Sequence, residues 1–237
     1  MSVAESLRAA LDARTAPSLL VEQEKERLRC LACAHRCSLI EGGRGVCGVR
    51  FVRDGTLFSP RGYVARHHVR SVESNVIFHV CPGALALHFG MYGCDLRCGY
   101  CHNHRISQAL RDGVEGHEFP TDTTAEALVA RALREGCKVV VAAYNEPMIS
   151  AEWVFEVFSS ARAAGLCTVV VTDGHTTART LEFLRPVTDA LRVDLKGWSS
   201  RHYRALGGRF ESVAEGLRIA RSLGFWLEIV TLVVPGF

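Results

Sequence analysis

Short apolar segments alternate with longer amphipathic segments along the last two thirds of the chain. The apolar segments, such as KVVVAA, are as long as β-strands and carry few polar positions, which is typical of strands covered on both faces. The segments between them have helical spacing, and Gly136, Gly165 and Gly224 stand where three helices should end. We predict strands at 84–90, 138–143, 167–172, 190–194 and 225–233, and helices at 124–135, 150–164, 177–185 and 212–223.

This order of elements predicts the fold class. Five strands, each joined to the next by a helix, indicate an α/β protein with a parallel sheet, in the form of an open or partial (β/α) barrel. In such folds the chemistry takes place at the C-terminal ends of the strands. Polar and ionisable residues follow the predicted strands here, in the segments 94–101, 144–146, 173–175 and 194–196. We therefore expect the functional site at this edge of the sheet.

The first 80 residues follow a different pattern. Residues 1–29 contain the amphipathic stretch SLRAALDAR and the densely charged stretch VEQEKERLR, and we expect a helical leader. Residues 30–80 begin with many cysteines and glycines and have a turn signal at Asp54-Gly55, so they predict a small metal-binding module and a connector. The predicted domains are the leader at 1–29, the Cys-rich module with its connector at 30–80, and the barrel core at 81–237.

The composition limits the partners and the location. The chain has 237 residues, of which 48% are hydrophobic and 22% charged, as in an ordinary soluble protein. Its formal net charge of +3 is too small to imply a nucleic-acid or membrane partner. No apolar run approaches the roughly 18 residues of a membrane span, and the N-terminus lacks the apolar region of a secretion signal. We expect a cytoplasmic protein without a nucleic-acid or membrane partner.

Seven of the ten cysteines form two groups. In a cytoplasmic α/β protein, clustered cysteines bind metal more often than they form disulfides. The first group is Cys30, Cys33, Cys37 and Cys47, the second is Cys94, Cys98 and Cys101, and the scattered ones are Cys81, Cys137 and Cys167. We interpret the scattered cysteines as structural.

The second group has the spacing C-x3-C-x2-C, which is one ligand short of a closed tetrahedral site. One interpretation is a zinc site completed by His102 or His104. A [4Fe–4S] cluster fits better, because three thiolates leave one iron open to a substrate or cofactor. The loop also follows a strand at the barrel mouth, whereas structural zinc sites usually form small modules of their own.

With Tyr100 before its last cysteine, this motif resembles that of the radical S-adenosylmethionine (SAM) enzymes. The resemblance implies that the open iron binds the amino and carboxylate groups of SAM. One electron, from a donor such as flavodoxin or ferredoxin, then cleaves SAM to methionine and a 5′-deoxyadenosyl radical, which abstracts hydrogen from a substrate. In such an enzyme the cofactors carry the chemistry, and the protein positions and shields them.

The first group has four cysteines at the spacing C-x2-C-x3-C-x9-C, enough to close a site without other ligands. The spacing does not choose between zinc and a second iron–sulfur cluster. His35 is a spare candidate ligand, which we interpret as a loop histidine. This segment, together with YNEP, RVDLKG and TLVVPG further along, resembles the AmmeMemoRadiSam-system radical SAM enzymes, which are relatives of the pyruvate formate-lyase activases. The similarity covers roughly residues 30–237.

The resemblance also implies a set of SAM contacts, to which Tyr100 belongs. Asn145 and Glu146 stand where the family has a Gly-Gly-Glu-like motif, so Glu146 would bind the methionine ammonium in a charge-assisted hydrogen bond. The alternative for Glu146 is a charge at the start of the following helix. Asp194 and Lys196 match the DLK motif of the glycyl-radical activases and would serve the cofactor's carboxylate or a nearby cation.

Two alternatives to this function stay open. The first alternative is a glycyl-radical enzyme activase, because His102-Asn103 and Asp194-Leu195-Lys196 are shared with these enzymes. Activases with extra clusters, however, place their additional cysteines after the cluster loop. Related chains continue through at least one further strand–helix unit, so we expect the last barrel unit to be missing. The second alternative is therefore a catalytically impaired or truncated iron–sulfur or zinc protein. The sequence identifies no catalytic residue and no substrate, and the substrate could itself be another protein. His175 is the residue to consider for a role toward the substrate.

Overall fold

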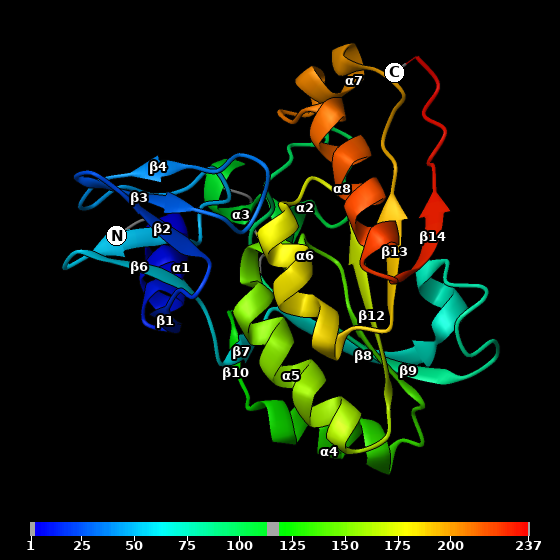
Figure 1. Ribbon diagram of the computed structural model, residues 1–237. Coiled ribbons are helices and arrows are strands. Elements are labelled where there is room, and N and C mark those ends of the chain that lie inside the picture. The colour runs from blue at the N-terminus through cyan, green and yellow to red at the C-terminus, as the bar shows by residue number, and fades with distance from the viewer. Residues whose placement is uncertain (1–2, 113–118, 237) are drawn as a thin grey trace.

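A mixed sheet forms the centre of the computed structural model, which describes residues 3–112 and 119–236 (Figure 1). Within these residues, six strands lie in the order β14-β13-β12-β11-β9-β8. The strands from β9 to β14 in this sheet are mutually parallel, whereas β8 runs antiparallel to β9. The strands of the sheet are β8 (Arg66–Ser71), β9 (Leu85–Gly90), β11 (Val139–Ala142), β12 (Cys167–Thr172), β13 (Ala190–Asp194) and β14 (Trp226–Val230).

Helices cover one face of this sheet (Figure 1). Val140 and Val170 belong to the large core that the sheet shares with the helices, whereas Val139, Val141 and Val169 form a separate apolar cluster on the opposite face. Because both faces are apolar, the strands have the continuous hydrophobic runs that the sequence shows. The covering helices are α4 (Ala125–Arg134), α5 (Ala151–Ala163), α6 (Ala178–Leu184) and α8 (Phe210–Ser222).

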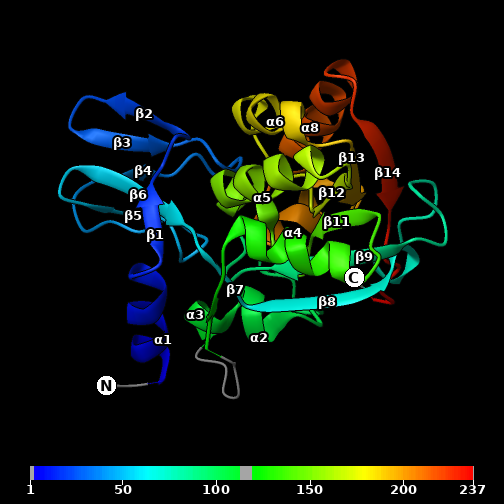
Figure 2. The ribbon, with the colours of Figure 1, turned by 90° about the horizontal axis from the view of Figure 1, so that it is seen from below.

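The N-terminal segment forms two small sheets and a helix beside the barrel (Figure 2). One sheet has the order β1-β6-β5 and the other the order β2-β3-β4. These elements are α1 (Val3–Asp12), β1 (Thr15–Pro17), β2 (Val21–Glu24), β3 (Arg27–Cys30), β4 (Ser38–Leu39), β5 (Phe51–Arg53) and β6 (Thr56–Pro60). The remaining elements are β7 (Tyr63–Val64), η1 (Val72–Asn75), α2 (His104–Ser107), α3 (Ala109–Asp112), β10 (Thr121–Asp122), η2 (Pro147–Ser150), η3 (Arg185–Val187) and α7 (Ser200–Ala205).

The five parallel strands and the α/β fold class predicted from the sequence are confirmed. The helical leader is correct only for α1, because residues 21–30 form the hairpin β2-β3. The charged stretch VEQEKERLR has no apolar helix face, and in the hairpin Val21 pairs opposite Cys30 on the core side. Lys25, with φ of 55°, makes the turn.

The antiparallel strand β8 was not predicted, because it lies in the segment that we interpreted as a connector. The predicted domain boundaries themselves stay a prediction, and their residues 1–2, 113–118 and 237 lie outside the described part of the chain. In that described part, no helix combines the length and the apolar character that crossing a membrane requires.

Candidate functional site

The cysteine loop, residues 94–101, follows β9 and leads into α2. Gly93, just before the loop, has φ of 91°, and a Cβ atom at this position would lie 2.8 Å from the carbonyl oxygen of Cys47. Only glycine accommodates this backbone conformation and this contact without strain. Within the loop, the N–H of Cys101 donates to the carbonyl of Cys98 at 3.1 Å, and the Cys101 sulfur lies 3.2 Å from the Ser107 hydroxyl. The loop is therefore a tight turn that lies against the N-terminal module.

A cavity of about 320 Å³ lies at the C-terminal ends of the parallel strands. Its size is that of a small-molecule site. All the residues that we predicted for the cluster and for SAM line this one cavity, namely Cys94, Cys98, Tyr100, Cys101, Asn145, Glu146, Asp194 and Lys196. The structure thus brings together residues from separate strand ends, and their roles in binding stay predictions.

Burial and the neighbouring charges set the protonation of the loop thiols. Burial, and after it the carboxyl of Asp173, raises the pKa of Cys94 well above its usual value. Burial also raises the pKa of Cys98 to about 12, although the charge of Lys196 acts in the opposite direction. Thiolates are the form that binds metal, so a bound metal has to displace these protons. The backbone N–H of Leu96 donates to the Cys94 sulfur, as is usual in metal–thiolate sites.

Glu146 reaches the cavity, and it also holds two strand ends together. Its Oε1 accepts hydrogen bonds from the N–H of Met148 at 3.0 Å and from the hydroxyl of Thr172 at 2.8 Å. Its Oε2 accepts one from the N–H of Asp173 at 2.8 Å. Burial, followed by the charge of Asp173, raises the pKa of Glu146 well above its usual value. Glu146 also caps the start of η2, as the alternative interpretation of this residue predicted.

The residues beside Glu146 form a compressed junction between β9 and β11. Tyr144 has φ of 74°, an uncommon conformation for a residue with a side chain. The Oδ1 of Asn145 accepts a hydrogen bond from the N–H of Met91 at 3.0 Å. A Cβ atom at Gly90 would lie 2.3 Å from the carbonyl oxygen of Ala143, so a side chain there would push the two strand ends apart. Asn145 is thus held by the end of β9.

Asp194 lies between two cations on the cavity wall. Its Oδ1 pairs with the guanidinium of Arg192, and its Oδ2 lies 3.3 Å from the Nζ of Lys196. Burial acts to lower the pKa of Lys196, but the charges of Asp194 and Cys98 outweigh it and raise the pKa overall. Tyr100 also contacts Cys98, and burial raises the pKa of Tyr100 to about 12. Lys196 is therefore a fixed positive charge beside the cysteine loop.

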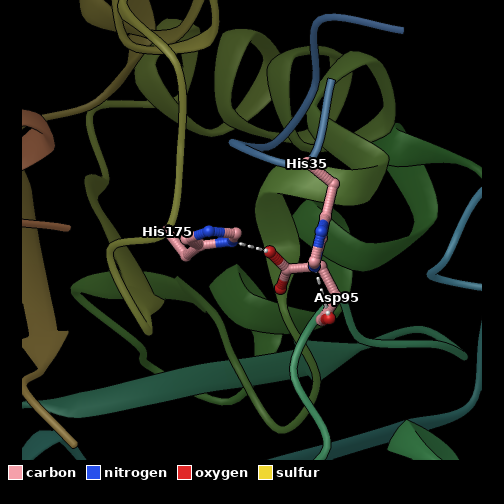
Figure 3. Close-up of side chains that lie close together, drawn as sticks. All are labelled: His35, Asp95 and His175. Carbon is pink, nitrogen blue, oxygen red and sulfur yellow. Dashed lines mark hydrogen bonds and ion pairs between the residues drawn. The ribbon is translucent and has the colours of Figure 1, made fainter. Parts of the chain in front are cut away.

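A buried polar network lies behind the cysteine loop (Figure 3). The carboxylate Oδ2 of Asp95 accepts a hydrogen bond from Nδ1 of His175 at 2.8 Å, and both side chains are fully buried. Nε2 of His35 lies 3.0 Å from the carbonyl oxygen of Asp95 and must be the donor there. Burial, and after it the charge of Asp95, raises the pKa of Asp173 to about 7. The segments that carry His35 and His175 therefore both contact Asp95.

The N-terminal cysteine set, Cys30, Cys33, Cys37 and Cys47, lies on the other side of this network. A Cβ atom at Gly45 would be 3.6 Å from the Cys47 sulfur and 3.8 Å from the Cys37 sulfur. Backbone N–H groups donate to these sulfurs: that of His35 to Cys33, and those of Val49 and Arg50 to Cys47. N–H donors of this kind stabilise metal-bound thiolates, and the metal site at this set stays a prediction.

A buried ion pair supports the same set. Arg50 is 1% exposed, and its guanidinium pairs with the carboxylate of Glu152 at the start of α5. Its Nη1 lies 3.9 Å from the Cys30 sulfur. Burial raises the pKa of Cys47 to about 11, and the charge of Arg50 acts against this rise. A fixed cation beside the sulfurs of Cys30 and Cys47 favours their thiolate form.

Sequence reasoning missed three of these functional candidates. Asp95 occupies a variable position of the cysteine motif, so the motif itself gives it no role. Arg192 lies inside a predicted strand. Arg50 lies directly before the short strand β5, and its partner Glu152 is 102 positions away. His175 could be found because it follows a strand end, and the structure places it against Asp95 rather than on the cavity wall.

Comparisons with known proteins show the family of the chain. The sequence model described as the Radical SAM superfamily matches residues 90–237. An uncharacterized protein of Methanocaldococcus jannaschii is 30% identical over 215 residues, which are 90% of this chain and 63% of that protein. A pyruvate formate-lyase-activating enzyme of Listeria monocytogenes is 30% identical over 123 residues, 48% of each chain. The chain thus spans less than two thirds of the length of these relatives.

Two solved structures are similar to part of this chain. QueE from Escherichia coli has a TM-score of 0.43 and 13% identity, over 73% of this chain and 95% of that one. SuiB from Streptococcus suis, bound to S-adenosylmethionine, has a TM-score of 0.44 and 18% identity, over 60% of this chain and 30% of that one.

Proposed function

The chain belongs to the radical SAM superfamily, and on this premise we propose that it is an enzyme that binds a [4Fe–4S] cluster at Cys94, Cys98 and Cys101 and SAM in the adjoining cavity. The observation that carries the proposal is the single cavity lined by the three cysteines and by the polar strand ends. Three thiolates and a neighbouring space suit a cluster with one open iron.

When bound, the cluster and SAM supply a reductive cleavage that yields a radical able to remove hydrogen from a substrate. The residues of the chain bind and orient these groups. The three thiols supply the iron ligands, and the Lys196 ammonium adds a positive charge beside the resulting thiolates. Lys196 and Asp194, held in one ion-paired group with Arg192, offer a cation and an anion to a zwitterionic ligand.

One experiment tests this function. The protein is reconstituted anaerobically with iron and sulfide, reduced, and mixed with SAM, and 5′-deoxyadenosine is measured. We expect product only when reductant and SAM are both present. The same product level in a Cys94/Cys98/Cys101→Ala variant would show that the cysteine loop does not carry the reaction. The substrate and the electron donor, such as flavodoxin or ferredoxin, stay outside this assay because SAM cleavage alone is the readout.

We expect the Glu146→Gln variant to bind SAM about 10- to 100-fold more weakly, the loss that a charge-assisted hydrogen bond of about 1.5–3 kcal/mol predicts. Isothermal titration of the reconstituted protein measures the affinity. Since Glu146 also bonds Thr172, the control is Thr172→Val, which removes this internal hydrogen bond and keeps the carboxylate. Equal affinity in both variants would mean that Glu146 only joins the strands.

The N-terminal cysteine set is proposed to hold a second metal, either zinc or an iron–sulfur cluster. Metal analysis of the Cys94/Cys98/Cys101→Ala variant separates the two, since only this set then remains. One zinc per chain would indicate a structural site, and about four iron atoms would indicate a second cluster. Further substitution of Cys47 by Ser is expected to remove that metal. Metal retained in that variant would exclude Cys47 as a ligand.

A glycyl-radical activase is the second candidate function. It is favoured by the 30% identity to the Listeria pyruvate formate-lyase-activating enzyme over 123 residues, together with the segment Asp194-Leu195-Lys196. Its substrate would be a glycine in another protein. An organic radical that forms on a second protein, rather than only 5′-deoxyadenosine, would distinguish this candidate by electron paramagnetic resonance.

A further inference from the structure

We infer that the N-terminal cysteine set and the cysteine loop are coupled sites, and that His35 is the positioning residue that joins them. In this arrangement, metal bound at the first set holds the loop in the geometry that retains its cluster. The inference rests on the proposed function, because it concerns the cluster at the loop. It goes beyond that function by assigning the first set a role in the second site.

The imidazole of His35 is the first physical link. His35 lies between Cys33 and Cys37 in the sequence, so metal binding at these residues fixes the segment that carries it. Its Nε2 donates to the carbonyl of Asp95, the residue directly after Cys94. Its ring also packs edge-on against His175, with the centroids 4.8 Å apart. The imidazole therefore connects the first set directly to the backbone of the loop.

His175 closes the link from the other side. Its Nδ1 bonds the Asp95 carboxylate, and its carbonyl accepts a hydrogen bond from the N–H of Ala34 at 3.0 Å. Cys33 also forms a backbone bridge with Thr176. The side chains of His175 and Asp95 are both fully buried, so neither can replace their hydrogen bond with one to water without a cost in free energy. Figure 3 shows the two imidazoles reaching Asp95 from different parts of the chain.

Gly93 and Arg111 also connect the N-terminal cysteine set to the cysteine loop, without the histidines. Gly93 meets the carbonyl of Cys47, as described above. The guanidinium of Arg111 donates to the carbonyl of Val46 and also to that of Cys94. One guanidinium thus donates both to the carbonyl oxygen beside Cys47 and to the carbonyl oxygen of Cys94. A displacement of residues 46–47 on metal loss would be felt directly at Cys94.

The structure separates the two tasks of His35, which makes the inference testable. The backbone N–H of His35 donates to the Cys33 sulfur, whereas the imidazole bonds Asp95. The His35→Ala variant should therefore keep its N-terminal metal and lose only the link. His35→Gln, whose amide N–H can take the place of Nε2–H, should restore it. His79→Ala, which removes an exposed imidazole that pairs with Glu228 on β14, is the matched control.

The readout is the rate at which a chelator removes iron from the cysteine loop of the reconstituted protein. In each background, the matching Cys98→Ala variant gives the iron that belongs to the N-terminal set, and this amount is subtracted. We expect loop iron to leave about three- to tenfold faster in His35→Ala and in Cys37→Ser, as the loss of one hydrogen bond of the link predicts. His35→Gln and His79→Ala should retain the rate of the parent protein.

A double substitution separates coupling from two independent effects. If His35 carries the link, Cys37→Ser should have a smaller effect in the His35→Ala background than in the parent protein, and the contacts of Gly93 and Arg111 account for the effect that remains. An unchanged rate in His35→Ala, or full additivity of the two substitutions, would overturn the inference. Circular dichroism of each variant shows whether it is folded, and a folded His35→Ala protein suffices for the test. If the parent protein holds no loop iron at all, the proposed function fails instead.

Discussion

The Cys98→Ala variant is expected to lose reductive SAM cleavage by more than about 100-fold, because removing even a group that only supports a metal ligand typically costs about 10- to 100-fold. Cys98 is one of the three cysteines of the loop that line the cavity, where we propose the cluster. Its neighbours Lys196 and Tyr100 stay in place in the variant, so the change removes a ligand and little packing. The measurements are 5′-deoxyadenosine formed per chain and iron bound per chain.

The control for this prediction is Cys137→Ala. Cys137 is a buried member of the main core and lies away from the cavity, so it tests the effect of losing a cysteine as such. We expect it to keep the iron content and the product of the parent protein. If Cys98→Ala retained product while Cys137→Ala did not, the assignment of the cluster to the cysteine loop would be wrong.

The parts of the site that could be predicted are those with a local pattern. The spacing of Cys94, Cys98 and Cys101 is visible within eight positions of the sequence. Glu146 and Lys196 could be found because parallel strands end at one edge of a sheet, so residues that follow two strands come together. For the same reason the strands themselves were predicted closely, since a buried parallel strand is a continuous apolar run.

The parts that could not be predicted depend on contacts between distant segments. Asp95 and His175 are separated by 80 positions, and Arg50 and Glu152 by 102. No periodicity in a single sequence reports such a pair, because each member lies in a segment with a sufficient local explanation. The hairpin β2-β3 is a similar case, in which pairing and core contact decide the conformation of a charged stretch that carries no strand pattern of its own.

These distant contacts share one function in the fold, which is to join the N-terminal module to the barrel. Asp95 accepts from His35 of the module through its carbonyl, and Arg50 of the module reaches α5 through Glu152. The second contact is made by two charges in the interior of the protein. It should therefore dominate the stability of the junction.

We expect the Arg50→Met variant to lose about 3–5 kcal/mol of the free energy of unfolding, the usual cost of leaving one buried charge without its partner. Glu152 is 8% exposed, and its Oε1 also accepts from the hydroxyl of Ser18 at 2.7 Å and from the N–H of Leu19 at 3.2 Å. These bonds keep the carboxylate in place after the guanidinium has gone. Urea unfolding of metal-loaded protein, followed by circular dichroism, measures the loss.

The loss should depend on pH in a defined direction. In the parent protein burial acts to raise the pKa of Glu152, but the charge of Arg50 and the hydrogen bonds outweigh it and hold the pKa below its usual value. That contribution is present above the ordinary glutamate pKa of about 4.3 and is lost as the pH falls through the lowered value. Without Arg50 the pKa of Glu152 should rise above 4.3, roughly the unfolded value, so the variant gains relative stability as the pH falls. The deficit is therefore expected to be largest at neutral pH and to shrink toward pH values near 4.

A double substitution shows whether the unpaired charge is the cause. Replacing both partners by apolar residues of similar size, Arg50→Met with Glu152→Leu, removes the buried charge together with its partner. We expect the double variant to be more stable at neutral pH than Arg50→Met alone, with a deficit that does not shrink at low pH. If the two substitutions instead add, the loss in Arg50→Met comes from the bonds of Arg50 to Ile149 and Ser18, at 2.6 and 2.8 Å, and not from the charge of Glu152.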